Sequence, residues 1–266
     1  MDRGSRILTL LVVPFVFLSA SCSPPPAPAV RPLEPGQQPL KVMVVGDSFG
    51  WSVYAGLDAF GRSSGQMVVH DATVVGCPFG RGGRNRGAGI DRPWPQECRD
   101  QDARLGALVE AIQPDVVVLA GGMWDVADRL LPGAKRWTRI GERGYDRYLA
   151  VELQHLTRLL GSGGAKVIWT TSPGWLPRYD PKNFMGRPPY SEAQPGRSAR
   201  FNWVLRRAVA TMPNVAILDL ALWMRAFPGG EFAPALRPDG AHFTIESSER
   251  VAGEWLGPWV IAVGRS

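Results

Sequence analysis

Two short polar segments, far apart in the chain, carry the residue types that nucleophilic catalysis needs. Gly46-Asp47-Ser48 directly follows an apolar run, and Asp239 stands three residues before His242 near the end of the chain. A serine hydroxyl is a weak nucleophile until a base removes its proton, and a histidine held by a carboxylate is such a base. Each segment alone is more typical of an ordinary turn. Together they predict a Ser48–His242–Asp239 catalytic site.

The elements that must position these residues alternate along the chain. Apolar runs predict strands at 41–45, 66–75, 116–120, 166–171 and 214–218. Segments with helical spacing predict helices at 49–62, 102–112, 144–160, 198–211 and 245–263. This alternation predicts a parallel sheet with helices on both faces. Ligands bind such sheets at the carboxyl ends of the strands, which is where Ser48 lies.

Residues 173–196 show no regular pattern and are rich in proline and aromatic residues. A loop of that length in a compact domain is usually a lid or a binding loop. Its aromatic side chains either stack on sugar rings or simply pack within the loop: Trp175, Tyr179, Phe184 and Tyr190.

Residues 1–21 have the pattern of a secretory signal peptide. A basic start is followed by an apolar run at 7–17, which is too short to span a bilayer because a spanning helix needs about 20 residues. Small residues precede Cys22 as they do at bacterial lipidation sites, although Ser19 stands where leucine is usual. We expect secretion across the cytoplasmic membrane and a lipid anchor on Cys22. Plain secretion and an uncleaved anchor are the alternatives.

The remaining chain divides into a tether and a domain. Residues 22–39 are Pro-rich and predict a semi-rigid tether, and residues 40–266 predict one α/β domain. Lipidation of Cys22 would leave Cys77 and Cys98 as an even pair, and secreted chains favour disulfides. Two buried free thiols are the alternative. No C-x-x-C or H-x-x-x-H spacing indicates a metal site.

Composition excludes several classes of protein. The 266 residues are 45% hydrophobic and 20% charged, which is ordinary for a packed domain and excludes a disordered chain or a coiled coil. The net charge of +6 is carried almost entirely by arginine. Arg81, Arg84, Arg86 and Arg92 either contact polyanions or form a solvated face. The absence of any nucleic-acid motif favours the solvated face, so we expect no nucleic-acid partner.

Val45-Gly46-Asp47-Ser48 and the segment 239–244 (DGAHFT) together resemble the SGNH (GDSL-type) hydrolase superfamily. The resemblance covers nearly all of the predicted domain and implies a three-layer α/β/α, flavodoxin-like fold without a cofactor. It implies that Ser48 is the nucleophile, His242 the base and Asp239 the residue that orients the base.

The resemblance also implies an oxyanion hole. Its donors are the N–H of Ser48, the N–H of a glycine matched by Gly76, and an asparagine whose position Trp124 occupies here. Either the Trp124 indole N–H replaces the amide, or the hole has two donors. One such donor is typically worth 100–1,000-fold in rate, about 3 kcal/mol.

The G-x-W-D variant at 122–125 and the Cys pair around Pro93-Trp94-Pro95 are similar to SGNH domains found beside integral-membrane acyltransferases that O-acylate cell-surface glycans. This closer resemblance implies a serine esterase acting, through an acyl-serine, on O-acyl esters of envelope glycans, O-acetyl in particular, or on small esters. One alternative is an O-acyltransferase that moves an acyl group to a polysaccharide hydroxyl. A soluble ester or a membrane acyltransferase partner would then supply the acyl group. A non-catalytic glycan-binding domain is the second alternative.

Overall fold

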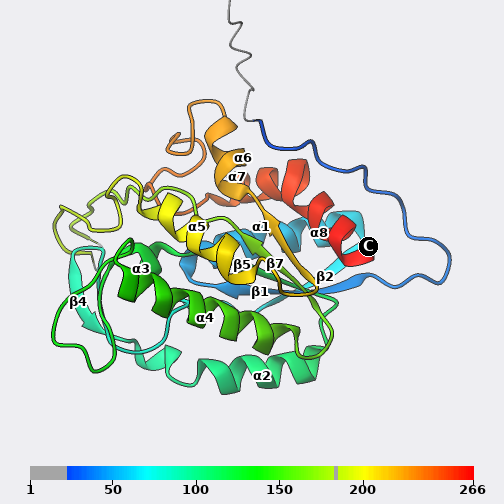
Figure 1. Ribbon diagram of the computed structural model, residues 1–266. Helices are drawn as coiled ribbons and strands as arrows, with labels where there is room; N and C mark the ends of the chain where they lie inside the picture. Colours follow the sequence, from blue (N-terminus) through cyan, green and yellow to red (C-terminus); the bar gives the residue numbers. More distant parts are fainter. Residues whose placement is uncertain (1–22, 183–184) are drawn as a thin grey trace, which may run out of the picture.

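A five-stranded parallel sheet forms the centre of the domain (Figure 1). The computed structural model describes residues 23–182 and 185–266. The strand order is β2-β1-β5-β7-β8, and all neighbouring strands run parallel. The strands are β1 (Leu40–Gly46), β2 (Met67–Asp71), β5 (Val116–Ala120), β7 (Lys166–Thr170) and β8 (Val215–Leu218). This sheet confirms the predicted fold class.

Helices cover both faces of the sheet (Figure 1). One layer contains α1 (Ser48–Ser64), α7 (Ile245–Val251) and α8 (Gly257–Arg265), and the other contains α2 (Gln101–Ile112), α4 (Arg143–Gly161) and α5 (Arg197–Val209). In α4 the leucines at 149, 153, 156 and 160 recur at helical spacing and are all buried. They form the apolar face that packs on the sheet.

The predicted single helix at 245–263 is interrupted in the structure. A π-helical turn, Ala252–Leu256, separates α7 from α8. Pro258 has no N–H to donate to the carbonyl of Glu254, so a regular α-helical bond is missing at this point. The predicted strand at 66–75 also ends earlier, at Asp71, where the Asp71 carboxylate accepts the Thr73 N–H at 2.8 Å and turns the chain.

The central strands are buried on both faces because helices cover each side. In β1 and β5 every apolar residue except Leu40 is at most 1% exposed. Numbered in their chain order, the five strands are arranged 2-1-3-4-5, so the winding direction reverses between β1 and β5. In open α/β sheets the ligand crevice lies at that reversal, at the carboxyl ends of the strands.

A second, three-stranded antiparallel sheet lies beside the first and was not predicted. Its order is β4-β3-β6, with β3 (Arg84–Gly87), β4 (Ile90–Pro93) and β6 (Asp128–Leu130). These strands are short and mostly polar, so they lack the alternation of apolar residues that marks a strand in sequence. Two short helices, α3 (Met123–Val126) and α6 (Leu220–Ala226), were also missed.

The described part of the N-terminal segment, from residue 23 onward, contacts the C-terminal part of the domain. The indole N–H of Trp255 donates to the carbonyl oxygen of Pro25 at 3.2 Å, which ties the start of the Pro-rich segment to the C-terminal helices. The predicted signal peptide and Cys22 lie outside the described residues. Within 23–182 and 185–266, no helix has both the length and the apolar character that crossing a bilayer requires.

Candidate active site

Ser48 stands at the first position of α1, immediately beyond the carboxyl end of β1. The preceding turn requires glycine at position 46, because a Cβ there would lie 1.9 Å from the carbonyl oxygen of Ala120 on β5. Asp47 caps the helix: its Oδ1 accepts the N–H groups of Phe49 at 2.9 Å and Gly50 at 3.4 Å. Gly46 and Asp47 therefore place Ser48 at the point between β1 and β5 where the winding direction of the sheet reverses.

The N–H of Ser48 is left without a protein acceptor by this arrangement. The first N–H groups of a helix have no partner within the helix. Asp47 satisfies those of Phe49 and Gly50 with its side chain and that of Trp51 with its carbonyl oxygen. Among the described residues no acceptor is bonded to the Ser48 N–H. This N–H is available to a ligand at the positive end of the helix dipole.

The segment before α7 brings His242 to the serine. His242 Nε2 lies 2.7 Å from Ser48 Oγ, and His242 Nδ1 lies 2.7 Å from Asp239 Oδ2. Asp239 is itself fixed, because its Oδ1 accepts the backbone N–H groups of Ala241 and His242 at 2.8 and 2.7 Å. The structure thus brings together the three residues that the sequence predicts as a triad.

The charges around His242 set its proton affinity. Burial raises the pKa of Asp239, but the bonds from the His242 ring and from two backbone N–H groups outweigh burial and lower that pKa to about 2. Burial lowers the pKa of His242, but Asp239, with a smaller contribution from Asp47, raises it overall. An ionised Asp239 holds the proton on Nδ1, which leaves Nε2 as the acceptor for the serine proton.

Asp47 lies beneath the triad and is nearly inaccessible to solvent. Its burial raises its pKa to about 6, against the opposing effect of the N–H groups of Phe49 and of the His242 charge. Asp47 therefore both shapes the turn that presents Ser48 and adds negative charge near the imidazole.

A small cavity opens above the serine. Its volume is about 260 Å³, and it is lined by Ser48, His242 and Asp239 together with mostly apolar side chains. The apolar lining includes Val75, Ala88, Met123, Trp124, Pro177 and Met185. Drug-sized ligands occupy pockets of about 300–1,000 Å³, so this cavity fits a smaller group.

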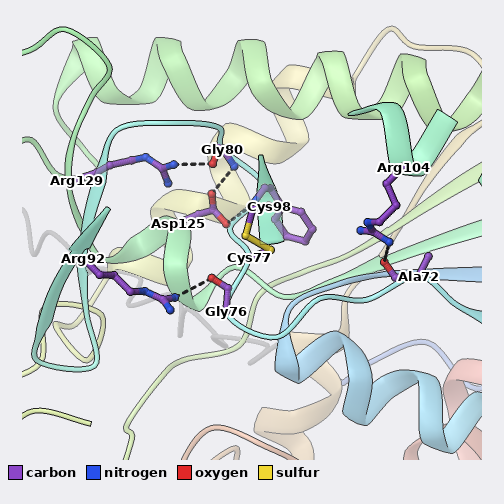
Figure 2. Close-up of a disulfide and its surroundings, with 10 residues drawn as sticks. Ala72, Gly76, Cys77, Gly80, Arg92, Cys98, Arg104, Asp125 and Arg129 are labelled. Carbon is purple, nitrogen blue, oxygen red and sulfur yellow. Dashed lines mark hydrogen bonds between the residues drawn. A yellow bond between two sulfur atoms is a disulfide. The ribbon is translucent and has the colours of Figure 1, made fainter. Parts of the chain in front are cut away.

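The segment after β2 reaches the same cavity through Val75. Figure 2 shows the next residue, Gly76, and its surroundings. The Val74 N–H donates to Gly46 and the Cys77 N–H donates to Val74. The intervening Gly76 N–H has no acceptor among the described residues. Gly76 has a positive φ of 78°, a conformation in which an L side chain is strained.

Three arginines hold the carbonyl oxygens of this segment (Figure 2). Arg104 donates to Ala72 at 3.1 Å, Arg92 to Gly76 at 2.8 Å, and Arg129 to Gly80 at 2.6 Å. These bonds join the segment to α2, β4 and β6 respectively.

A buried carboxylate and a disulfide complete the attachment of the segment (Figure 2). Asp125 accepts the N–H groups of Phe79 and Gly80 at 2.9 and 2.8 Å, and its burial raises its pKa to about 6. Cys77 and Cys98 are joined by a disulfide with a Cα–Cα separation of 5.7 Å. The residue next to Gly76 is therefore bonded covalently to Cys98, the last residue of a short 3-10 turn that precedes α2.

Trp124 occupies the position where the family motif has asparagine. Its ring lines the cavity, but its Nε1 is buried without a hydrogen-bond partner among the described residues. The guanidinium of Arg92 lies 3.9 Å from the centre of this ring. The Trp124 side chain is 2% exposed, and its stacking against Arg92 holds the ring in place with the N–H shielded from solvent.

The family model of the SGNH domain fused to AT3 domains matches residues 21–256. The chain belongs to the SGNH family. No curated protein sequence matches it. Solved structures of SGNH proteins share the fold at low identity. The chain aligns with a GDSL-like lipase from Bacteroides thetaiotaomicron at 14% identity and a TM-score of 0.51, over 86% of this chain and 92% of the lipase.

A second solved structure similar to this SGNH chain is described as the lipopolysaccharide acetyltransferase periplasmic domain of Salmonella ser. Paratyphi A. It aligns at 13% identity and a TM-score of 0.50, over 81% of this chain and 82% of that one. A third, an α/β hydrolase from the metagenome of Lake Arreo, Spain, aligns at 15% identity and a TM-score of 0.50, over 86% of this chain and 98% of that one. At these identities the likeness establishes the fold alone.

Two aromatic residues of the loop at 173–196 fit the alternative in which they pack within the protein. Trp175 and Tyr190 are 3% and 6% exposed, and Trp175 packs on Phe49 with a ring separation of 5.2 Å. Neither is placed to stack on a sugar. Tyr179 is exposed, and Phe184 lies outside the described residues. Pro177 and Met185 of the loop line the cavity.

Sequence reasoning also missed residues that shape the site. Arg92 was grouped with a solvated arginine face, yet its side chain turns inward onto Gly76 and Trp124. Asp125 was noted only as part of the G-x-W-D variant and Arg129 not at all, because their backbone partners are 45 to 49 residues away. No group of three or more potential metal ligands occurs within the described part of the chain.

Proposed function

We propose that the protein is a serine esterase that cleaves short-chain O-acyl esters through an acyl-serine intermediate. The continuous contact from Asp239 through His242 to Ser48, with 2.7 Å at each step, supports this function most directly. Nucleophile, base and orienting carboxylate stand in hydrogen-bond order beside a cavity that admits a small group.

The reaction proceeds in two acyl transfers. Ser48 Oγ attacks the ester carbonyl carbon while His242 Nε2 takes the hydroxyl proton. The tetrahedral intermediate then collapses, the C–O bond to the alcohol breaks, and His242 returns the proton to the alcohol oxygen. Water attacks the acyl-serine with His242 again as the base, and the carboxylic acid and free Ser48 are released.

The oxyanion of each intermediate has two backbone donors in this proposal. The N–H groups of Ser48 and Gly76 have no acceptor among the described residues, and both belong to segments that border the cavity. The buried Nε1 of Trp124 favours the hole with two donors over replacement of the amide by the indole.

The acyl group in this proposal is short. The apolar lining suits a methyl or a similarly small alkyl group, and a volume of about 260 Å³ leaves little room for a long chain. We propose acetyl esters as the preferred substrates, with the ester carried by a cell-envelope glycan or by a small alcohol.

Transfer to a polysaccharide hydroxyl is the second candidate. The matching family is defined by SGNH domains fused to AT3 domains, and one solved structure with this fold is a lipopolysaccharide acetyltransferase domain. The first transfer would be unchanged, and a sugar hydroxyl would replace water in the second. A membrane acyltransferase partner would then supply the acyl group.

We also propose that the domain works outside the cytoplasm on a lipid anchor at Cys22. The disulfide between Cys77 and Cys98 supports an oxidising compartment, because such bonds rarely persist in the cytosol. The apolar run at 7–17 followed by Cys22 supports the lipidated export route.

The decisive experiment compares Ser48→Ala with Ser52→Ala. Ser52 lies one turn along α1, where its hydroxyl donates to the Ser48 carbonyl, so Ser52→Ala likewise removes one serine hydroxyl from the same helix. We expect Ser48→Ala to abolish hydrolysis of p-nitrophenyl acetate and labelling by a fluorophosphonate, while Ser52→Ala keeps both. Equal turnover in Ser48→Ala and wild type would refute the proposed triad.

The products distinguish hydrolysis from transfer. Wild-type protein is incubated with p-nitrophenyl acetate with and without oligosaccharides, and mass spectrometry measures acetylated sugar against free acetate. The esterase proposal predicts free acetate as the main product at all sugar concentrations. Acetylated sugar that grows at the expense of acetate would favour the transferase.

A further inference from the structure

We propose that Arg92 is the positioning residue of the oxyanion hole: it fixes Gly76 and places a positive charge against Trp124, where the family motif has an asparagine that donates a hydrogen bond. The inference rests on the proposed function, because it concerns stabilisation of the same acyl-transfer intermediates.

The placement of Arg92 joins two of the three family oxyanion positions. Its Nη2 donates to the Gly76 carbonyl at 2.8 Å, and its guanidinium carbon lies 3.9 Å from the centre of the Trp124 ring. A Cβ on residue 76 would lie 2.9 Å from Nη2, so a side chain at this position would displace the guanidinium. Arg92 itself comes from β4, the outer strand of the small sheet.

Among the described arginines of the β3–β4 strand pair, only Arg92 forms no ion pair. Its neighbours in the small sheet, Arg84 and Arg86, both form ion pairs with Asp91. No ion pair joins Arg92 to any carboxylate of the described residues, and its Nε is buried without a partner. Burial lowers the pKa of Arg92, yet a guanidinium remains charged at neutral pH. The side chain is therefore a half-buried cation without an ion pair, although the Glu97 carboxylate partly offsets the effect of burial on its charge.

This charge has a clear use during catalysis. A negative charge forms on the ester oxygen only in the tetrahedral intermediate, and donors or cations fixed beside that oxygen lower the barrier without moving. Arg92 acts through Gly76: holding its carbonyl fixes the backbone that presents the Gly76 N–H. Its own charge adds a favourable field that ground-state binding of a neutral ester does not use.

Arg104 offers a matched control. Its Nη1 donates to the Ala72 carbonyl at 3.1 Å in the same segment, its Nε is also buried without a partner, and burial lowers its pKa as well. It shares the tethering role of Arg92 but bonds four residues before Gly76. Arg92→Met and Arg104→Met therefore remove equivalent tethers, of which only the first touches the proposed oxyanion hole.

The experiment measures kcat, KM and the affinity for a boronic acid, which forms a tetrahedral, negatively charged adduct with the serine. We expect Arg92→Met to lower kcat about 100-fold, the smaller end of the effect of losing one oxyanion donor. Boronate affinity should fall with kcat, and KM should stay within about twofold because the ground state carries no charge. Arg104→Met should change none of the three by more than about threefold, since its partner Ala72 lies four residues before Gly76.

A conservative variant separates charge from shape. Arg92→Lys keeps the charge and a donor to Gly76 but loses the flat face on Trp124, and we expect it to recover activity to within about tenfold of wild type. Ser48-dependent hydrolysis with equal kcat in both methionine variants would overturn this inference and leave the proposed function standing. A higher KM and a lower folding stability in Arg92→Met, with unchanged boronate affinity, would also overturn it. Wild-type protein without Ser48-dependent hydrolysis would overturn both.

Discussion

Removing the disulfide should destabilise the domain by an amount that can be worked out from its position. Cys77 and Cys98 are 21 residues apart, and closing a loop of that length in the unfolded chain is worth about 3 kcal/mol. Domains are stable by only about 5–15 kcal/mol, so this is a large share of the total. For a domain of this size the loss corresponds to a Tm lower by roughly 6–12 °C.

The assay is urea unfolding of wild type and of Cys77→Ser/Cys98→Ser, followed by tryptophan fluorescence. Dithiothreitol should lower the wild-type midpoint toward that of the double variant and leave the variant unchanged, which serves as the control. Activity should fall less than in Arg92→Met, because Asp125 and Arg129 still hold the segment at Gly80. A midpoint that neither reduction nor mutation moves would refute the entropic argument.

Two further variants test the roles assigned around the triad. Asp239→Asn removes the charge that raises the His242 pKa, so the acid limb of the pH profile of kcat/KM should move to lower pH; the maximal rate should fall about 10⁴-fold from loss of the correct tautomer. An acid limb that stays in place would show that Asp239 does not set the His242 pKa. Trp124→Phe removes the indole N–H but keeps a ring under Arg92, so kcat should change by less than about tenfold, whereas loss of a true oxyanion donor costs 100–1,000-fold.

The elements that position the triad could be predicted because each has a local signal. Residues 42–45 of the predicted run are buried in the structure, and Gly46 and Asp47 lead directly into Ser48. The Asp239–His242 spacing is likewise short enough for one turn to impose the contact. The meeting of the two segments, 194 residues apart, was predicted because the two motifs occur together, since only Ser48 follows a strand, whereas Asp239 and His242 lie between α6 and α7.

The oxyanion side of the site could not be predicted in the same way. Arg92 sits on a four-residue strand with no apolar alternation, and nothing in its neighbours distinguishes it from Arg84 or Arg86. Its partners are a backbone carbonyl 16 residues away and the face of a ring, and neither leaves a pattern in the sequence. Such contacts are decided by the packing of the small sheet, which only the folded chain reveals.

The two sides of the site therefore depend on different kinds of interaction. Ser48 and His242 are carried by the ends of β1 and α7, which belong to the main sheet and its helices, so hydrophobic burial holds them in place. Gly76 is held by a disulfide, by guanidinium bonds to carbonyl oxygens, and by a buried carboxylate. Reducing conditions remove only the covalent tie on the oxyanion side. As reductant is added, the protein should therefore lose ester turnover while Ser48 still reacts with a fluorophosphonate. Loss of fluorophosphonate labelling before loss of turnover would show that the triad side fails first.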